Sequence, residues 1–78
     1  MLKLFKIYQA SPDTQRIWAM LKQIKQYSIC YNCSTATTYC LIYNIPEFKK
    51  TFKVYYTPAT DTAQRIEVYR NMEEYKND

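Results

Sequence analysis

The chain has no glycine among its 78 residues, and this absence limits both its turns and its chemistry. A two-residue type I′ hairpin turn needs positive φ at both central positions, which glycine and asparagine adopt most readily. We therefore expect longer loops to close the hairpins of this chain. A glycine-rich loop around a phosphate group is also excluded, so the chain has no nucleotide-binding motif of the Walker or dinucleotide type.

Length and charge predict one small domain with a basic surface. Because a chain of 78 residues buries only part of the surface that its unfolded form exposes, residues 1–78 are expected to form a single domain with a small core. Lysine and arginine number 11 against 7 aspartate and glutamate residues, a net charge of +4. Such a surface attracts nucleic acid or an acidic protein. No segment resembles a signal peptide or a membrane span, and three cysteines without an export signal favour the reducing cytoplasm.

The clearest local signal is a helix start that follows an N-terminal strand. Residues 2–10 alternate as a strand does, and apolar side chains on both faces favour a central place in a sheet. Ser11 is a good N-cap, Pro12 suits the first helical position, and Asp13 suits the positive end of the helix dipole. We expect the helix to run to about residue 27 and to pack on the sheet through one stripe: Ile17, Met20, Leu21, Ile24 and Ser28.

Further segments are expected to complete an antiparallel sheet. Their composition and alternation predict strands at 29–33, 39–45, 48–57 and 64–69, with turns near 34–38, 44–47 and 57–61. In the last strand Ile66 and Val68 point inward, and Asn71 caps a short helix over 72–76; one continuous helix from Thr62 is the alternative. The sequence thus predicts an α+β fold in β-α-β-β-β order, with about four to five antiparallel strands and one amphipathic helix on one face.

The three cysteines, Cys30, Cys33 and Cys40, do not by themselves predict a metal site. Structural zinc takes four Cys or His ligands, and the chain has no histidine. In a strand, Cys30 and Cys33 point to opposite faces and lie too far apart for a disulfide. Cys33 and Cys40 face each other if the hairpin closes between them, and whether they pair stays open. We expect three small buried side chains, no metal and no cofactor.

Catalytic groups are also lacking. Cysteine and serine nucleophiles need a nearby base, and the commonest base, histidine, is missing. Asp13 and Glu47 are explained by a helix start and a turn, and Glu73 and Glu74 by solvation of the C-terminal end. The expectation is a protein without enzymatic activity.

Lysines beside aromatic residues form one candidate surface. Trp18, Lys22 and Lys25 share an arc of the expected helix, although Trp18 also suits packing over the rim of the sheet. A second basic set lies beside Tyr55: Lys49, Lys50 and Lys53, joined by Lys3 if the strands are adjacent. Lysines on phosphates and rings stacked on bases would make a nucleic-acid-binding module, and this is the alternative function.

Tyrosines in an uncharged stretch support the main hypothesis. Residues 26–46 carry no charged side chain, and their tyrosines alternate with Ser, Thr and Asn, as in recognition surfaces. A small core cannot bury all nine tyrosines of the chain with their hydroxyls bonded. We therefore expect a protein-binding surface that includes five aromatic residues: Trp18, Tyr31, Tyr39, Tyr43 and Tyr55.

The expected function is stoichiometric binding to a larger host protein or nucleoprotein with an acidic or nucleic-acid-binding face. Residues of AT-rich codons are abundant, which is typical of phage and mobile-element accessory proteins. Small phage anti-defence proteins such as anti-CRISPRs inhibit by occluding a surface in this way, but no motif here identifies a family. The sequence leaves open the partner, the process and whether the chain is a monomer or a homodimer.

Overall fold

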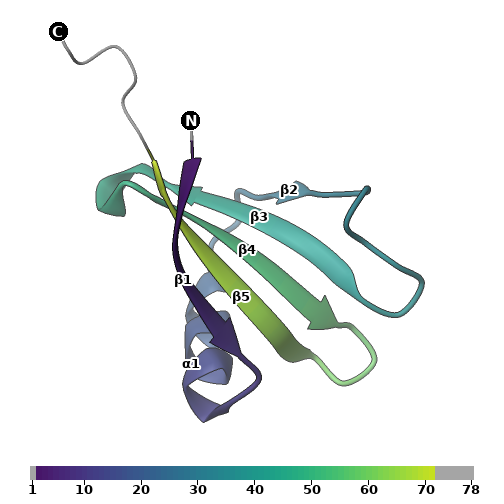
Figure 1. Cartoon of the computed structure of the whole chain (residues 1–78). Coiled ribbons are helices and arrows are strands. Elements are labelled where there is room, and N and C mark those ends of the chain that lie inside the picture. Colours follow the sequence, from purple (N-terminus) through teal and green to yellow (C-terminus); the bar gives the residue numbers. More distant parts are fainter. Residues whose placement is uncertain (1, 72–78) are drawn as a thin grey trace, which may run out of the picture.

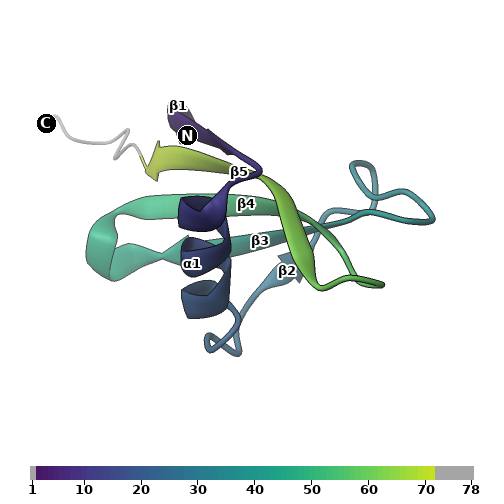
Figure 2. The same cartoon turned by 90° about the horizontal axis from the view of Figure 1, so that it is seen from below.

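The computed structural model describes residues 2–71 and shows a five-stranded antiparallel sheet with one helix against one face (Figure 1, Figure 2). The elements in chain order are β1 (Leu2–Gln9), α1 (Pro12–Leu21), β2 (Ser28–Ile29), β3 (Tyr39–Ile45), a 3-10 turn η1 (Pro46–Phe48), β4 (Lys50–Thr57) and β5 (Thr62–Asn71). The predicted α+β fold is confirmed, and β5 excludes a helix from Thr62. The helix predicted over residues 72–76 lies outside the described residues.

The strand order is β1-β5-β4-β3-β2, so the first and last strands of the described chain are neighbours. The predicted central place of β1 is wrong, because β1 forms one edge of the sheet and β5 lies inside it. Its apolar side chains remain in solvent on both faces: Leu2, Leu4, Phe5 and Ile7. Apolar alternation therefore indicated a strand correctly but did not show which neighbours would cover it.

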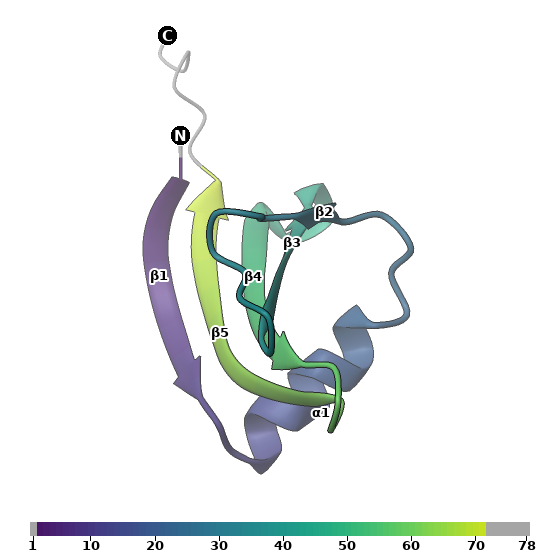
Figure 3. The same ribbon diagram turned by 90° about the vertical axis from the view of Figure 1, so that its right-hand side faces the viewer.

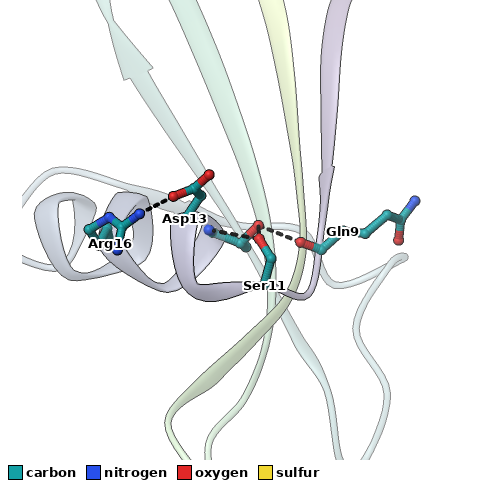
Figure 4. A network of polar contacts seen from close by, with 5 residues as sticks. Gln9, Ser11, Asp13 and Arg16 are labelled. Carbon is teal, nitrogen blue, oxygen red and sulfur yellow. Dashed lines mark hydrogen bonds and ion pairs between the residues drawn. The ribbon is translucent and has the colours of Figure 1, made fainter.

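Helix α1 begins where the sequence predicts. The Ser11 hydroxyl accepts a hydrogen bond from the Thr14 amide at 3.2 Å, and Pro12 takes the first helical position. Asp13 forms an ion pair with Arg16 (Figure 4). The Thr14 hydroxyl donates to the Gln9 carbonyl oxygen, which ties the helix start to the end of β1. Of these contacts, the bond from the Thr14 amide to Ser11 satisfies a backbone N–H that the first turn of a helix leaves free.

The end of α1 and its buried face differ from the prediction. The helix ends at Leu21 rather than near residue 27, because Gln23 and Ile24 donate to carbonyls three residues back and tighten the last turn. Thr14, Trp18 and Leu21 are its buried residues, whereas Met20 is exposed and Ser28 belongs to β2. The Thr14 hydroxyl is hydrogen-bonded to Ser11 and to Gln9, so burial of this side chain leaves no polar group without a partner. The buried face consequently turns toward Trp18, and Ile17 and Ile24 flank it.

The core lies between α1 and the sheet face that α1 covers. The buried residues of this cluster are Trp18, Leu21, Leu41, Tyr43, Val54, Ala63, Ile66 and Val68. Ile66 and Val68 thus point inward as predicted. The opposite face, which we call the open face, carries the intervening residues of the inner strands, and its centre is polar. There Glu67 is buried and accepts hydrogen bonds from Arg65 at 2.8 Å and Tyr69 at 2.6 Å.

A glutamine extends the sheet beyond the end of β1. The pairing of β1 with β5 stops at Gln9 and Arg65, so Ala63 lies past the last residue of β1. The Gln15 side chain fills this place, because its amide nitrogen donates to the Ala63 carbonyl at 2.7 Å and its amide oxygen accepts from the Ala63 N–H at 2.9 Å. Helix and sheet are thereby joined by two hydrogen bonds in addition to apolar packing.

The loops close without glycine, as the composition requires. Lys49 and Asp61 take the left-handed backbone region, with φ of 54° and 52°. Pro46–Phe48 form the 3-10 turn, so the strand predicted from residue 48 begins at Lys50. The strand predicted over 29–33 is wrong: β2 holds only Ser28–Ile29, and the chain then leaves the sheet until Tyr39.

Candidate functional site

The segment from Cys30 to Thr38, called the β2–β3 loop here, leaves the sheet between β2 and β3 (Figure 3). It is held by hydrogen bonds and contributes no residue to the core cluster. The Cys30 N–H donates to the Cys40 carbonyl at 2.9 Å, and the Cys33 N–H donates back to the Cys30 carbonyl at 3.2 Å, which closes a turn. The Ser34 hydroxyl donates to the Cys30 carbonyl at 2.8 Å and accepts from the Cys40 N–H at 3.0 Å. Ser34 therefore ties the loop to the start of β3.

One side of this loop forms an aromatic groove. Its volume is about 390 Å³, and we call it the tyrosine groove; it is lined by Ile29, Tyr31, Ser34, Thr35 and Tyr39. Tyr31 is 78% exposed, and Ile29 and Tyr39 are each 43% exposed. Tyr39 is steadied by an edge-on contact with Tyr56, whose ring centroid lies 5.9 Å away. The groove thus combines apolar surface with the hydroxyl groups of two tyrosines and carries no charge.

Of the five aromatic residues predicted at a protein interface, the structure brings two together. Tyr31 and Tyr39 line the tyrosine groove. Trp18 and Tyr43 are buried at 3% and 2% exposure and belong to the core, so they are not available as surface contacts. Burial raises the pKa of Tyr43 to about 12. Tyr55 stands on the open face, and burial likewise raises its pKa to about 12.

Trp18 shows why the helix surface was misjudged. Its indole N–H donates to the Asp61 carboxylate at 3.2 Å, and its ring packs against Tyr56 at a centroid distance of 4.8 Å. Lys22 lies over the same ring, 5.5 Å from its centroid, and forms an ion pair with Asp61 at 2.6 Å. The tryptophan and its lysine neighbour thus bind the β4–β5 turn instead of projecting to a partner.

The other side of the loop brings the three cysteines together. The sulfur atoms of Cys30, Cys33 and Cys40 all lie within 4.8 Å of one another, and those of Cys30 and Cys33 are 2.7 Å apart. This contradicts the prediction that Cys30 and Cys33 point to opposite faces, because they belong to a turn and not to a strand. The expectation of three buried side chains is also wrong in part: Cys40 is buried, whereas Cys30 and Cys33 are half-buried. The C-x-x-C spacing is typical of such turns and could have predicted this one, but the strand-like composition was given more weight.

Lys53 of β4 is the charged neighbour of this cluster. Hydrogen bonds from Cys30 and from Lys53 hold the pKa of the Cys33 thiol below its usual range, while the bond to Cys33 raises the pKa of Lys53. Burial raises the pKa of the Cys40 thiol to about 12. The Lys53 ammonium also lies over the Tyr55 ring, 5.7 Å from its centroid. Thiols, a lysine and a tyrosine therefore meet on the open face beneath the loop.

The lysines predicted to contact nucleic acid do not form one surface. Lys22 forms an ion pair with Asp61, and Lys53 lies under the β2–β3 loop. Lys50 lies on the face of β4 opposite to that of Lys53. Lys25 is exposed in the segment after α1, and Lys49 in the turn before β4. A basic row runs across three strands instead: Arg70 of β5, which the sequence analysis did not include, is in register with Lys3 on β1 and with Lys50 on β4. Strand order alone brings these side chains together.

Comparison with known proteins adds no relative: no family model matches the chain, and neither the curated proteins nor the solved structures gave a match. Within residues 2–71, no helix combines the length and apolar character that crossing a membrane requires. The function must therefore be inferred from the surfaces themselves.

Proposed function

We propose that this chain is a non-enzymatic binding protein that contacts a larger protein through the tyrosine groove. The observation that supports this best is Tyr31, a large aromatic side chain that is 78% exposed on a loop closed by hydrogen bonds. Tyrosine supplies much contact area at a low cost in conformational entropy, and exposed tyrosines beside Ser and Thr are typical of recognition loops. Ile29 and Tyr39 add apolar surface beside it.

The chemistry of the groove indicates its partner. The groove carries no charged side chain, so the fitting surface is an apolar protrusion with hydrogen-bond acceptors for the tyrosine hydroxyls. The net charge of +4 favours acidic surroundings on the partner. The composition typical of mobile-element accessory proteins favours a host protein or nucleoprotein, which the chain would inhibit stoichiometrically by covering its surface.

The test compares matched variants as baits in extracts of candidate host cells, followed by affinity measurement with the purified partner. Tyr31→Ala should weaken binding by about 2 kcal/mol or more, roughly 30-fold in Kd, if Tyr31 is a central contact. Phe48→Ala is the control, because Phe48 is also an exposed aromatic residue, 60% accessible, but lies in η1 outside the groove. Equal losses from both variants, or none from Tyr31→Ala with the fold intact, would refute the assignment of the groove.

Nucleic-acid binding is a second candidate, supported by the basic row of Lys3, Arg70 and Lys50. The Lys50 ammonium and the Arg70 guanidinium lie 4.9 Å and 5.3 Å from the centroid of the Phe5 ring, which is half-exposed. Two cations beside an accessible ring, with Lys3 in the same row, can pair phosphates while a base stacks. The row lies where β1, β5 and β4 meet, and Lys3, Phe5 and Arg70 line a small hollow of about 150 Å³ there.

A salt titration separates the two candidates. If the basic row binds single-stranded oligonucleotides, affinity falls steeply between about 50 and 200 mM salt, and Lys50→Ala reduces the slope of log K against log salt by about 0.7. Lys25→Ala is the control, because Lys25 is an exposed lysine outside the row. Absence of binding at low salt would eliminate this candidate and leave the tyrosine groove as the functional surface.

A further inference from the structure

The three-cysteine cluster is unexplained by either binding surface. We propose that Cys30, Cys33 and Cys40 bind one Zn²⁺ ion as thiolates, with the fourth coordination position left to water. The inference concerns the side of the β2–β3 loop opposite the tyrosine groove and does not depend on the proposed function.

The geometry of the sulfur atoms carries this assignment. Tetrahedral zinc with Zn–S bonds of about 2.3 Å places its sulfur ligands about 3.8 Å apart. The sulfur pair of Cys30 and Cys33 is 2.7 Å apart, and no pair in the cluster exceeds 4.8 Å. The ideal sulfur–sulfur separation therefore lies between the observed ones. Side-chain rotations that move each sulfur atom by about 1 Å are enough to reach it.

The backbone around the cluster has the form that a zinc ion needs. Two cysteines three positions apart sit at the ends of a hydrogen-bonded turn, and the third comes from the strand opposite, where the Cys30 N–H bonds to the Cys40 carbonyl. Ser34 fixes both sides of this arrangement through its hydroxyl. Cys40 is fully buried, whereas Cys30 and Cys33 are half-buried, so the open coordination position faces solvent.

Charge balance also favours a divalent ion. Three thiolates around Zn²⁺ carry a net charge of −1, and the Lys53 ammonium that bonds Cys33 offsets it. Glu67, in register with Lys53 on the neighbouring strand, is paired with Arg65, so the arginine offsets its charge. Thiolate ligands without histidine select soft or borderline ions such as zinc over magnesium or calcium.

The ion would give the β2–β3 loop a cross-link that it otherwise lacks. No residue from Cys30 to Thr38 belongs to the core cluster, so the loop is held by hydrogen bonds alone. A metal that joins the turn to β3 would hold the loop to the sheet through three protein ligands, one fewer than the four protein ligands of an ordinary structural zinc site. A disulfide between Cys30 and Cys33 would close only the turn itself and leave Cys40 without a role.

The test uses the whole chain, reduced, freed of metal with a chelator and titrated with Co²⁺ and then Zn²⁺. We expect one ion per chain, an intense thiolate-to-cobalt charge-transfer absorption, and displacement of Co²⁺ by Zn²⁺. Cys33→Ser should weaken Zn²⁺ binding more than roughly 100-fold, since even loss of an outer partner of a metal ligand costs 10–100-fold. Thr37→Ala, an exposed change in the same loop, should leave binding unchanged.

Cys30→Ser provides a second variant, because Cys30 is half-buried, whereas replacing the buried Cys40 would place a hydroxyl group in the interior. Loss of the cobalt band in both half-buried variants, with native circular dichroism, supports the site. Zinc bound without thiolate absorption, unaltered zinc affinity in Cys33→Ser, or no zinc bound by the reduced chain would each overturn it. A Cys30–Cys33 disulfide found in protein isolated from cells under thiol-blocking conditions would overturn it as well.

Discussion

Replacing Gln15 should destabilise the whole domain, although this side chain is polar and belongs to a helix surface. Its amide is the partner of both backbone groups of Ala63, at 2.7 Å and 2.9 Å, and Ala63 is fully buried at 0% exposure. Gln15→Ala leaves a buried N–H and a buried C=O without partners. Each such group costs about 1–3 kcal/mol, so the two together cost about 2–6 kcal/mol. Because water can enter and bond one of them, we expect a loss in the lower part of this range, about 2–4 kcal/mol.

The loss is large for a chain of this size. Domains have unfolding free energies of about 0.05–0.15 kcal/mol per residue, and the expected change is therefore a large part of the total. In a domain of this size, each kcal/mol of lost unfolding free energy lowers Tm by about 4–8 °C, so Tm should fall by roughly 10–25 °C. The assay is urea unfolding followed by the fluorescence of Trp18, the one tryptophan of the chain, which is buried against Tyr56.

Two controls identify the cause. Gln26→Ala removes an exposed glutamine side chain and should change stability by less than about 0.5 kcal/mol. Gln15→Leu keeps a side chain of similar size but no polar partner for Ala63, so it should lose nearly as much as Gln15→Ala. If Gln15→Ala is as stable as Gln26→Ala, the two hydrogen bonds do not hold helix and sheet together. If Gln15→Leu restores stability, the loss comes from packing.

Two further predictions concern charge and backbone strain. The Lys22 ammonium, with the Trp18 indole, holds the pKa of Asp61 below its usual range, so the ionised carboxylate stabilises the fold above its unfolded-state pKa, and this is lost as pH falls through its folded-state pKa. Asp61→Asn should therefore be less stable than the native chain at pH 7, and the difference should disappear in acid. A difference in Tm that stays constant across the pH titration would contradict this. Lys49 has φ of 54°, where a Cβ atom costs about 1 kcal/mol, so Lys49→Gly should be more stable than Lys49→Ala in urea unfolding, and equal stabilities would show that the turn carries no strain.

Local signals in the sequence predicted the elements whose partners are close by. Ser11 and Pro12 marked the helix start correctly because a cap is satisfied within one turn. Alternation along β4 and β5 placed Ile66 and Val68 in the core, since a strand with one covered face repeats every two residues.

Features that depend on distant partners were not predictable in this way. Trp18 is buried where Asp61, far along the chain, accepts its indole N–H. The place of β1 at the sheet edge depends on its pairing with β5. The cysteines were assigned to a strand because residues 29–33 have strand-like composition, but the turn at Cys30–Cys33 prevents it.

Both proposed sites include residues of the β2–β3 loop together with residues of the strands that flank it. The tyrosine groove and the cysteine cluster lie on opposite sides of the β2–β3 loop, and residues 30–38 contribute nothing to the core cluster. Substitutions at Tyr31 or Cys33 should therefore alter binding without unfolding the sheet, whereas Gln15→Ala should unfold the sheet without touching either site. If zinc binding and partner binding are then lost together in Cys33→Ser but only partner binding is lost in Tyr31→Ala, the ion acts by holding the loop in the conformation that presents Tyr31.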